Sequence, residues 1–184
     1  MRYEIRLSGS GGQGLILAGL ILAEAAAIYD DKNATQSQSY GPEARGGASR
    51  SDVIISDEEI DYPKAISIDL LLALTQEASD KYTRDLKKGS IVIVDSGFVT
   101  SLPKGDFKLY TVPITDIATK EIGKALVANI LALGLITGLS KVVTVGAMET
   151  AIRARVPKGT EELNMRAFKK GLEIAASQEA LAKG

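Results

Sequence analysis

Hydrophobic and charged residues alternate in "RYEIRLSG", residues 2–9 of the chain. A period of two predicts a β-strand with one buried face, on which Tyr3, Ile5 and Leu7 are expected to lie. The glycine-rich stretch "GSGGQG" follows this strand. It leads into "LILAGLILAEAAAIY", residues 15–29, which carries Glu24 as its one charge. A helix that is apolar almost all round is buried on most sides, so residues 15–29 are expected in the core.

The remaining hydrophobic pattern predicts a chain of short strands and helices. Strands are expected over residues 34–39, 49–56, 65–74, 90–96 and 107–113. Helices are expected over residues 75–89, 114–123, 124–139, 145–156 and 159–177. We interpret residues 57–59 as a turn and "IDYP", residues 60–63, as the returning strand of an antiparallel hairpin at the sheet edge. The pattern predicts an α/β fold, a mostly parallel layered sheet with helices on both faces, built as a single domain over residues 1–184.

Composition narrows the class of protein. The 184 residues are 45% hydrophobic, which suits one compact core, and the formal net charge is −1. Lysine and arginine are dispersed, so the charge pattern indicates neither nucleic-acid binding nor a membrane surface. The N-terminus has no secretory signal pattern, and the apolar runs fall short of the ~20 clean residues of a membrane span. We therefore expect a soluble, cytoplasmic protein.

Two residue types that carry much enzyme chemistry are absent. Without cysteine, the chain offers no thiolate nucleophile, no cysteine-bound zinc and no ligands for an iron–sulfur cluster. Without histidine, it lacks the commonest general base near neutral pH. The acidic turn "SDEEIDYP" lacks the pattern of a calcium loop. We therefore assign no catalytic residue and no metal ligand, and we expect any redox chemistry on a partner chain or a bound organic cofactor.

The first glycine loop matches G-x-G-x-x-G at Gly9, Gly11 and Gly14, between a predicted strand and a predicted helix. Glycines permit close backbone approach, and a helix N-terminus attracts anions, so the loop predicts phosphate or dinucleotide binding. Gly12 and Gln13 complete the candidate site. A nicotinamide site would place an acidic residue at the end of the second strand, but that strand ends in "QSQS". The alternative is that the glycines only allow the helix and the strand to pack closely.

A second loop, "SYGPEARGGAS" at residues 39–49, combines stiff Pro42 with flexible glycines and one cation. In a doubly wound sheet the loops after the first two strands lie at the same edge. Arg45 would then lie near the first glycine loop, where an anion or another protein's surface would satisfy both. The candidate residues here are Tyr40, Gly41, Arg45, Gly46 and Gly47. A surface turn with a solvated arginine is the alternative.

Asn129 interrupts an otherwise apolar predicted helix. A buried amide needs hydrogen-bond partners, which a glycine loop or a neighbouring subunit could supply. A purely structural role between packed helices is the alternative. The two apolar helices, over residues 15–29 and 124–139, are expected to leave apolar surface, so we expect a homodimer when the chain is isolated.

The two loops in this order resemble the gamma subunit of the 2-oxoacid:ferredoxin oxidoreductases. "GSGGQG", "QSQSYGPEARGGAS", "SDVIIS", "IVIVDSGFV" and "NILALGLITGL" carry the resemblance, which covers most of the chain and is nearest to the 2-oxoglutarate type. The resemblance implies an enzyme complex that oxidatively decarboxylates a 2-oxoacid to an acyl-coenzyme A and passes electrons to ferredoxin. It also implies alpha, beta and ferredoxin-like partner subunits, which hold thiamine diphosphate and the iron–sulfur clusters.

In that family the gamma chain helps to form the coenzyme A site, and its two glycine loops face the catalytic partners. We carry this expectation to residues 11–14 and 41–47. Three alternatives remain open at this point. One is a stand-alone nucleotide-binding protein of the Rossmann type, and another is a subunit of an indolepyruvate-type oxidoreductase. A scaffold whose glycines serve packing alone is a third alternative.

Overall fold

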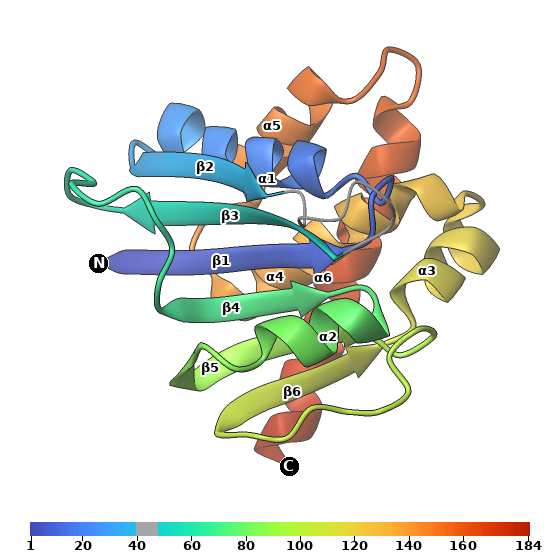
Figure 1. The fold of residues 1–184 in the computed structure, drawn as a ribbon. Helices are drawn as coiled ribbons and strands as arrows, with labels where there is room; N and C mark the ends of the chain where they lie inside the picture. The colour runs from blue at the N-terminus through green and yellow to red at the C-terminus, as the bar shows by residue number, and fades with distance from the viewer. Residues whose placement is uncertain (40–47) are drawn as a thin grey trace.

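The computed structural model describes residues 1–39 and 48–184, and six of their strands form one mixed sheet in the order β2-β3-β1-β4-β5-β6 (Figure 1). β1, β4, β5 and β6 run parallel, while β3 runs antiparallel to its neighbours β1 and β2. The expected α/β fold with a mostly parallel sheet is confirmed. The strands are β1 (Arg2–Gly9), β2 (Asn33–Ser39), β3 (Ser49–Ser56), β4 (Ile68–Ala73), β5 (Leu86–Asp95) and β6 (Phe107–Val112).

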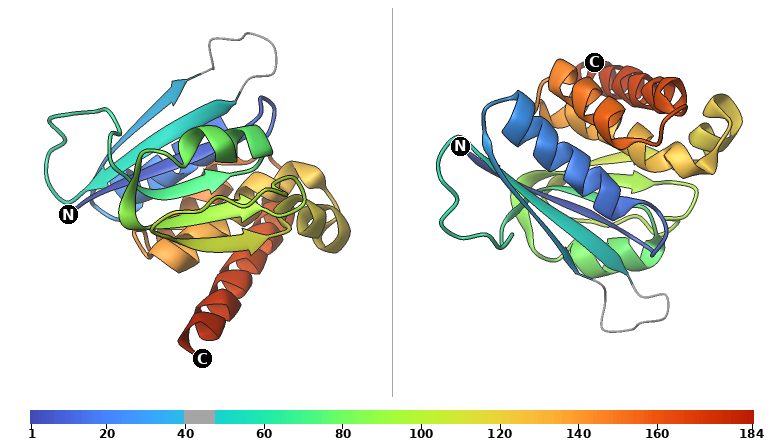
Figure 2. Two further views of the ribbon diagram at one scale, coloured as in Figure 1. Left: turned by 60° about the horizontal axis from the view of Figure 1, so that its bottom comes forward. Right: turned by 90° about the horizontal axis from the view of Figure 1, so that it is seen from above.

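Helices cover the two faces of the sheet unequally. α1, α4, α5 and α6 share one core with one face of the sheet, and α2 packs on the other face (Figure 2, right). The α-helices are α1 (Leu15–Glu24), α2 (Gln76–Tyr82), α3 (Ile114–Ile117), α4 (Ala128–Ser140), α5 (Val145–Arg155) and α6 (Glu161–Lys183). Turns of π-helix follow α1 (Ala25–Tyr29) and α3 (Ala118–Ile122), and a 3₁₀ turn (Ala125–Val127) precedes α4. No helix in the described part of the chain combines the length and apolar character that crossing a bilayer requires.

The expected returning strand at residues 60–63 is wrong. β3 already pairs with β1 on one side and with β2 on the other, so it has no free edge for a third strand. Residues 57–67 instead cross the end of the sheet as an irregular segment. The buried carboxylate of Glu4 accepts hydrogen bonds of 2.7 Å from the backbone N–H groups of both Ile66 and Ser67. This contact directs the chain into β4.

The expected helix at residues 75–89 is also too long. The side chain of Thr75 caps α2 by accepting from the Ala78 N–H, and the helix ends at Tyr82. Leu86 then begins β5, whose first residues pair beside β4, and Lys87 forms an ion pair of 2.9 Å with Asp69. The residues of "DLKKG" favour a helix, but in the structure they lead into strand β5. Pairing with β4 supplies backbone hydrogen bonds that stabilise the strand more than an exposed last helical turn would.

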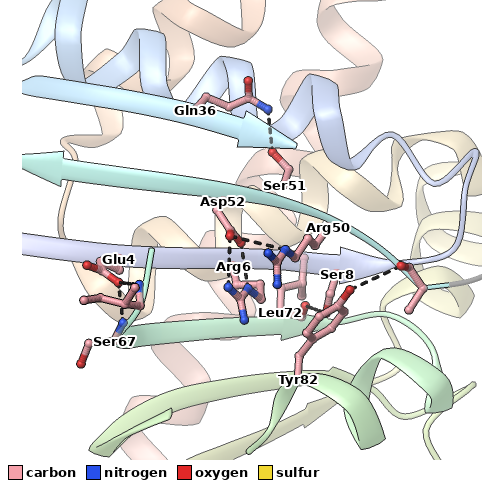
Figure 3. Close-up of polar contacts among 12 residues, drawn as sticks. Glu4, Arg6, Ser8, Gln36, Arg50, Ser51, Asp52, Ser67, Leu72 and Tyr82 are labelled. Carbon is pink, nitrogen blue, oxygen red and sulfur yellow. Dashed lines mark hydrogen bonds and ion pairs between the residues drawn. The ribbon is translucent and has the colours of Figure 1, made fainter. Parts of the chain in front are cut away.

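β1 is buried on both faces rather than on one. Ile5 and Leu7 enter the main core as the alternation predicts, but Glu4 and Arg6 on the opposite face are only 2% and 5% exposed. The Arg6 guanidinium donates to both carboxylate oxygens of Asp52 on β3, at 2.8 and 3.1 Å (Figure 3). The ring of Tyr82 covers the same guanidinium, 5.3 Å from its centre. Pairing and hydrogen bonding allow this charged face to be buried.

The two apolar helices belong to one core, which removes the reason given for a homodimer. α4 packs along α6, and nearly all its residues are buried. Gly134 of α4 and Gly171 of α6 lie at the crossing, where a Cβ on Gly134 would be 2.8 Å from the Cα of Gly171. A homodimer of the isolated chain stays a prediction that light scattering can check.

Candidate functional site

The ends of β1 and β2 and the start of β3 lie at one end of the sheet. Gly9 at the end of β1 pairs with Ser49 at the start of β3. Ser39 at the end of β2 pairs with Arg50. The described residues that flank the second loop, Ser39 and Ala48, thus lie at the same end of the sheet as the first glycine loop, which is the end at which parallel α/β sheets bind ligands. The second loop itself lies outside the described residues, so its place beside the first loop stays a prediction.

The first glycine loop has the backbone that its sequence predicts. Gly12 and Gly14 have φ of 84° and 72°, in the left-handed region that glycine tolerates best. The Gln13 side chain turns back, and its Oε1 accepts from the Ser10 N–H at 2.7 Å. Gln13 therefore closes the turn with this oxygen instead of pointing it at a ligand. A Cβ on Gly11 or Gly12 would meet no atom within 4 Å, so the outer side of the loop is open.

The N-terminus of α1 is left without a side-chain cap. Gly14 is the N-cap residue and has no side chain to accept from the first N–H groups, and the first turn contains no acidic residue. Unpaired N–H groups at a helix start carry partial positive charge and favour an anion. The start of α3 differs, because the Asp95 carboxylate accepts a hydrogen bond of 3.0 Å from the Thr115 N–H in its first turn.

Asn129 holds the glycine loop from behind. It is 5% exposed, and its Nδ2 donates to the Gly14 carbonyl oxygen at 3.1 Å while its Oδ1 accepts from the Ile130 N–H at 2.9 Å. A Cβ on Gly14 would collide with the Asn129 side chain. The hydrogen bond to the glycine loop that was considered from sequence is thus present. Asn129 positions the loop from inside the protein.

A cavity of about 310 Å³ opens beside the loop. Gly12 and Gln13 form one wall, and the opposite side comes from segments that follow β4, β5 and β6 and precede α4. Its other lining residues are Leu74, Phe98, Thr115, Ala125, Leu126 and Ala128. Phe98 and Leu126 are 51% and 77% exposed, so the mouth of the cavity is apolar. An open helix N-terminus beside an apolar cavity suits a ligand with an anionic part and an apolar arm.

Asp95 ties two walls of this cavity together, and the sequence analysis did not select it. Its fully buried carboxylate accepts from the Gly97 N–H at 3.0 Å, and also from the N–H (3.0 Å) and hydroxyl (2.7 Å) of Thr115. Phe98 and Thr115 are thereby fixed relative to each other. A polar residue directly after a buried parallel strand was the available signal, because that position lies at the ligand-binding edge.

Five of the candidate residues lie outside the described residues: Tyr40, Gly41, Arg45, Gly46 and Gly47. Ala48, the first described residue after them, is 2% exposed and is held at both backbone groups by α2. Its N–H donates to Glu77 at 3.3 Å, and its carbonyl oxygen accepts from the Tyr82 hydroxyl at 3.4 Å. Within residues 1–39 and 48–184, no group of three or more acidic side chains could hold a metal ion.

Comparison with known proteins agrees with this geometry. A family model described as "Pyruvate ferredoxin/flavodoxin oxidoreductase" matches residues 4–174. The chain belongs to this family. It is 56% identical over 177 residues to "2-oxoglutarate synthase subunit KorC" of Methanocaldococcus jannaschii, covering 95% of each chain.

Two solved structures of oxoacid oxidoreductases share the fold. The gamma subunit of a keto/oxoacid ferredoxin oxidoreductase from Geobacter sulfurreducens superposes with a TM-score of 0.90 at 54% identity, covering 96% of this chain and 98% of that one. A 2-oxoglutarate:ferredoxin oxidoreductase from Magnetococcus marinus, solved with 2-oxoglutarate, coenzyme A and succinyl-CoA bound, superposes with a TM-score of 0.82 at 22% identity. The match covers 96% of this chain and 31% of that longer chain.

The strand order of this family member also disfavours a plain nicotinamide site. In a dinucleotide-binding sheet the second strand lies beside the first and its end presents the acidic residue to the ribose. Here the antiparallel β3 lies between β1 and β2, and β2 is the edge strand. This chain therefore has the G-x-G-x-x-G spacing of dinucleotide-binding proteins but lacks, beside β1, the parallel second strand that would present an acidic residue to the ribose.

Replacing Gly12 by valine is expected to lower activity of the assembled enzyme far more than stability of the chain. At φ 84° a residue with a branched Cβ adds strain of about 1–2 kcal/mol, and there is no collision within 4 Å to add to it. The side chain would, however, stand on the open side of the loop. Thermal unfolding of the chain and steady-state kinetics of the complex measure the two effects.

Gly89→Val is the matched control for this substitution. Gly89 has φ of 73° and open space around it, and it lies near the start of β5, far along that strand from the cavity. A similar loss of stability with normal activity is expected. Equal losses of activity in the two variants would mean that Gly12 serves packing alone.

Proposed function

We propose that the chain is the gamma subunit of a 2-oxoglutarate:ferredoxin oxidoreductase, a complex that converts a 2-oxoacid to an acyl-coenzyme A. The observation that carries this proposal is the 56% identity, over 95% of both chains, to a 2-oxoglutarate synthase subunit. It disfavours a stand-alone nucleotide-binding protein and an indolepyruvate-type subunit.

The chemistry of the chain fits a subunit that holds a substrate for partner subunits. Without cysteine it cannot ligate an iron–sulfur cluster, and without histidine it has no obvious proton-transfer pair. Thiamine diphosphate and the clusters therefore belong to the alpha, beta and ferredoxin-like subunits, and ferredoxin accepts the electrons of the complex. The cytoplasm is the proposed compartment.

Coenzyme A is the ligand we propose for the edge cavity. The uncapped N-terminus of α1, with Gly11, Gly12 and Gly14 before it, would hold a phosphate group. Phe98 and Leu126 would contact the apolar arm, and Asn129 would keep the glycine loop in place. When bound, coenzyme A supplies the thiol that accepts the acyl group. Gln13, Tyr40, Gly41, Arg45, Gly46 and Gly47 complete the proposed site.

A reconstituted complex tests the substrate assignment. The chain is mixed with its partner subunits, and reduction of a viologen dye is followed with 2-oxoglutarate, pyruvate or indolepyruvate. The highest kcat/KM is expected with 2-oxoglutarate. The purified chain alone should be colourless and reduce no dye. Turnover by the lone chain, or a clear preference for another 2-oxoacid, would contradict the proposal.

Arg45→Ala is expected to raise the KM for coenzyme A about tenfold with little change in the KM for the 2-oxoacid. In the wild type this cation is expected to pair with an anionic group of the ligand. A tenfold change in affinity corresponds to about 1.4 kcal/mol of binding free energy. Arg153→Ala serves as control, because Arg153 is an exposed arginine of α5 that, among the described residues, forms an ion pair with Glu162. Unchanged coenzyme A kinetics in the Arg45 variant would remove this residue from the site.

A further inference from the structure

On the second sheet face, α2 is the one α-helix among the described residues that packs on the strands. α2 packs against β1 and β4, and its Tyr82 ring lies over the Arg50 guanidinium of β3; within residues 1–39 and 48–184, no helix covers β2 on this side. The strand register places Ser37 of β2 beside Asp52 of β3, and Asp52 beside Arg6 of β1. A groove of about 510 Å³ runs between these strands and the segment that follows β3. Its far wall is made of Pro63, Lys64, Ala65 and Ile66.

The groove has positive charge in excess. Among the described residues that line it, Asp52 is the one carboxylate, and both of its oxygens already accept from Arg6. Arg50 approaches the same carboxylate only at 3.6 Å, and its side chain is 35% exposed (Figure 3). Lys64 forms no ion pair with any residue that the structure describes. Arg50 on β3 thus shares Asp52 with Arg6, and Lys64 on the far wall has no carboxylate partner among the described residues.

Two exposed apolar side chains flank these cations. Tyr62 is 52% and Ile66 is 67% exposed, and both lie on the segment that bears Lys64. Tyrosine and arginine are both enriched at the centres of protein–protein interfaces.

The segment is also held in one conformation. Glu4 accepts from the N–H groups of Ile66 and Ser67, and the Arg2 guanidinium donates to the Lys64 carbonyl oxygen at 3.1 Å. The Arg2 side chain in turn pairs with Glu4 at 2.9 Å. Since the backbone is fixed before a partner arrives, binding costs less ordering entropy than a loose loop would.

We propose that Arg50, Tyr62, Lys64 and Ile66 form a docking surface for another subunit of the oxidoreductase. The partner lays a segment over the groove, with a carboxylate against Arg50 and Lys64 and an apolar side chain against Tyr62 and Ile66. The turn before the segment is itself acidic, with Asp57, Glu58, Glu59 and Asp61. Because like charges repel, an acidic part of the partner is expected to contact the groove and not this turn. The inference rests on the proposed function, because it requires partner subunits.

Lys64→Glu and Ile66→Asp test the docking surface. Both side chains are exposed, and both substitutions leave the backbone contacts with Glu4 and Arg2 in place, so the fold is expected to survive. Association with the immobilised partner subunits is measured by interferometry. Each variant should bind about tenfold more weakly. The effect of Lys64→Glu should shrink at high salt and that of Ile66→Asp should not.

Lys108→Glu is the control, because Lys108 is an exposed lysine of β6, the opposite edge strand of the sheet. It should bind like the wild type. Wild-type affinity of both groove variants would overturn the proposal. So would a change confined to self-association or to the KM for coenzyme A, since these would identify a second copy or the cofactor as the occupant. Failure of the wild type to bind any partner subunit would instead contradict the proposed function.

Discussion

A 2-oxoglutarate:ferredoxin oxidoreductase assembled without this chain is expected to form no detectable acyl-coenzyme A. Acyl transfer requires a thiol held next to the reacting carbon. Holding two reactants in place contributes as much as about 7–11 kcal/mol to catalysis. We assign that role to the glycine loop, the uncapped start of α1 and the cavity between Gly12 and Phe98. The partner subunits would retain their cofactors but would lack the bound acyl acceptor.

Chromatographic assay of acyl-coenzyme A in a mixture of purified subunits measures this loss. Addition of the wild-type chain should restore the product, and addition of the Gly89→Val chain should restore it nearly as well. The Gly12→Val chain should restore assembly without full turnover. Normal product formation by the complex that lacks the chain would show that another subunit holds coenzyme A unaided.

Replacing Gly134 by valine is expected to destabilise the chain by about 3 kcal/mol or more. α4 and α6 approach so closely that a Cβ at this position would lie 2.8 Å from the Cα of Gly171 and would collide with the Phe168 carbonyl oxygen. These are backbone atoms, which cannot move away by changing a rotamer. The helices must separate, and the apolar contacts along the whole of α4 are weakened as a result.

Urea unfolding of the purified chain measures this effect, with Gly146→Ala as the matched control. Gly146 lies in α5, and an added Cβ there would meet no atom within 4 Å. That substitution should leave stability unchanged or raise it by up to about 1 kcal/mol, because alanine favours helix over glycine. A Gly134→Val chain as stable as the wild type would mean that α4 and α6 can shift apart without loss.

The strongest local patterns in the sequence determined the elements that carry the site. Period-two alternation specified β1, and the long apolar run specified α1 with its π-helical extension. The spacing of Gly9, Gly11 and Gly14 specified a loop between them, and two of the loop residues do adopt positive φ. These features depend on residues that are close together in the sequence. A glycine affects the backbone at its own position, and an alternating pattern affects the strand that contains it.

Only the tertiary structure decided which charged residues are buried. Arg6 looked solvent-facing by alternation, but Asp52 and Tyr82, more than forty residues away along the chain, surround it. Asp95 became a support of the cavity because Thr115, in the first turn of α3, lies next to it. No local pattern encodes such partners, since they depend on which strands become neighbours.

Strand pairing likewise decided two boundaries that local propensity placed elsewhere. Residues 60–63 have no strand to pair with because β1 and β2 occupy both edges of β3. Leu86–Gly89 would extend a helix by composition, but they lie beside β4 and enter β5. The sequence by itself thus determined the glycine loop, its helix and the class of fold. The packing of β1, β3 and β4 decided which residues surround these elements. A buried charge or polar group is stable only with a hydrogen-bond partner, and the tertiary structure decides which residue becomes that partner.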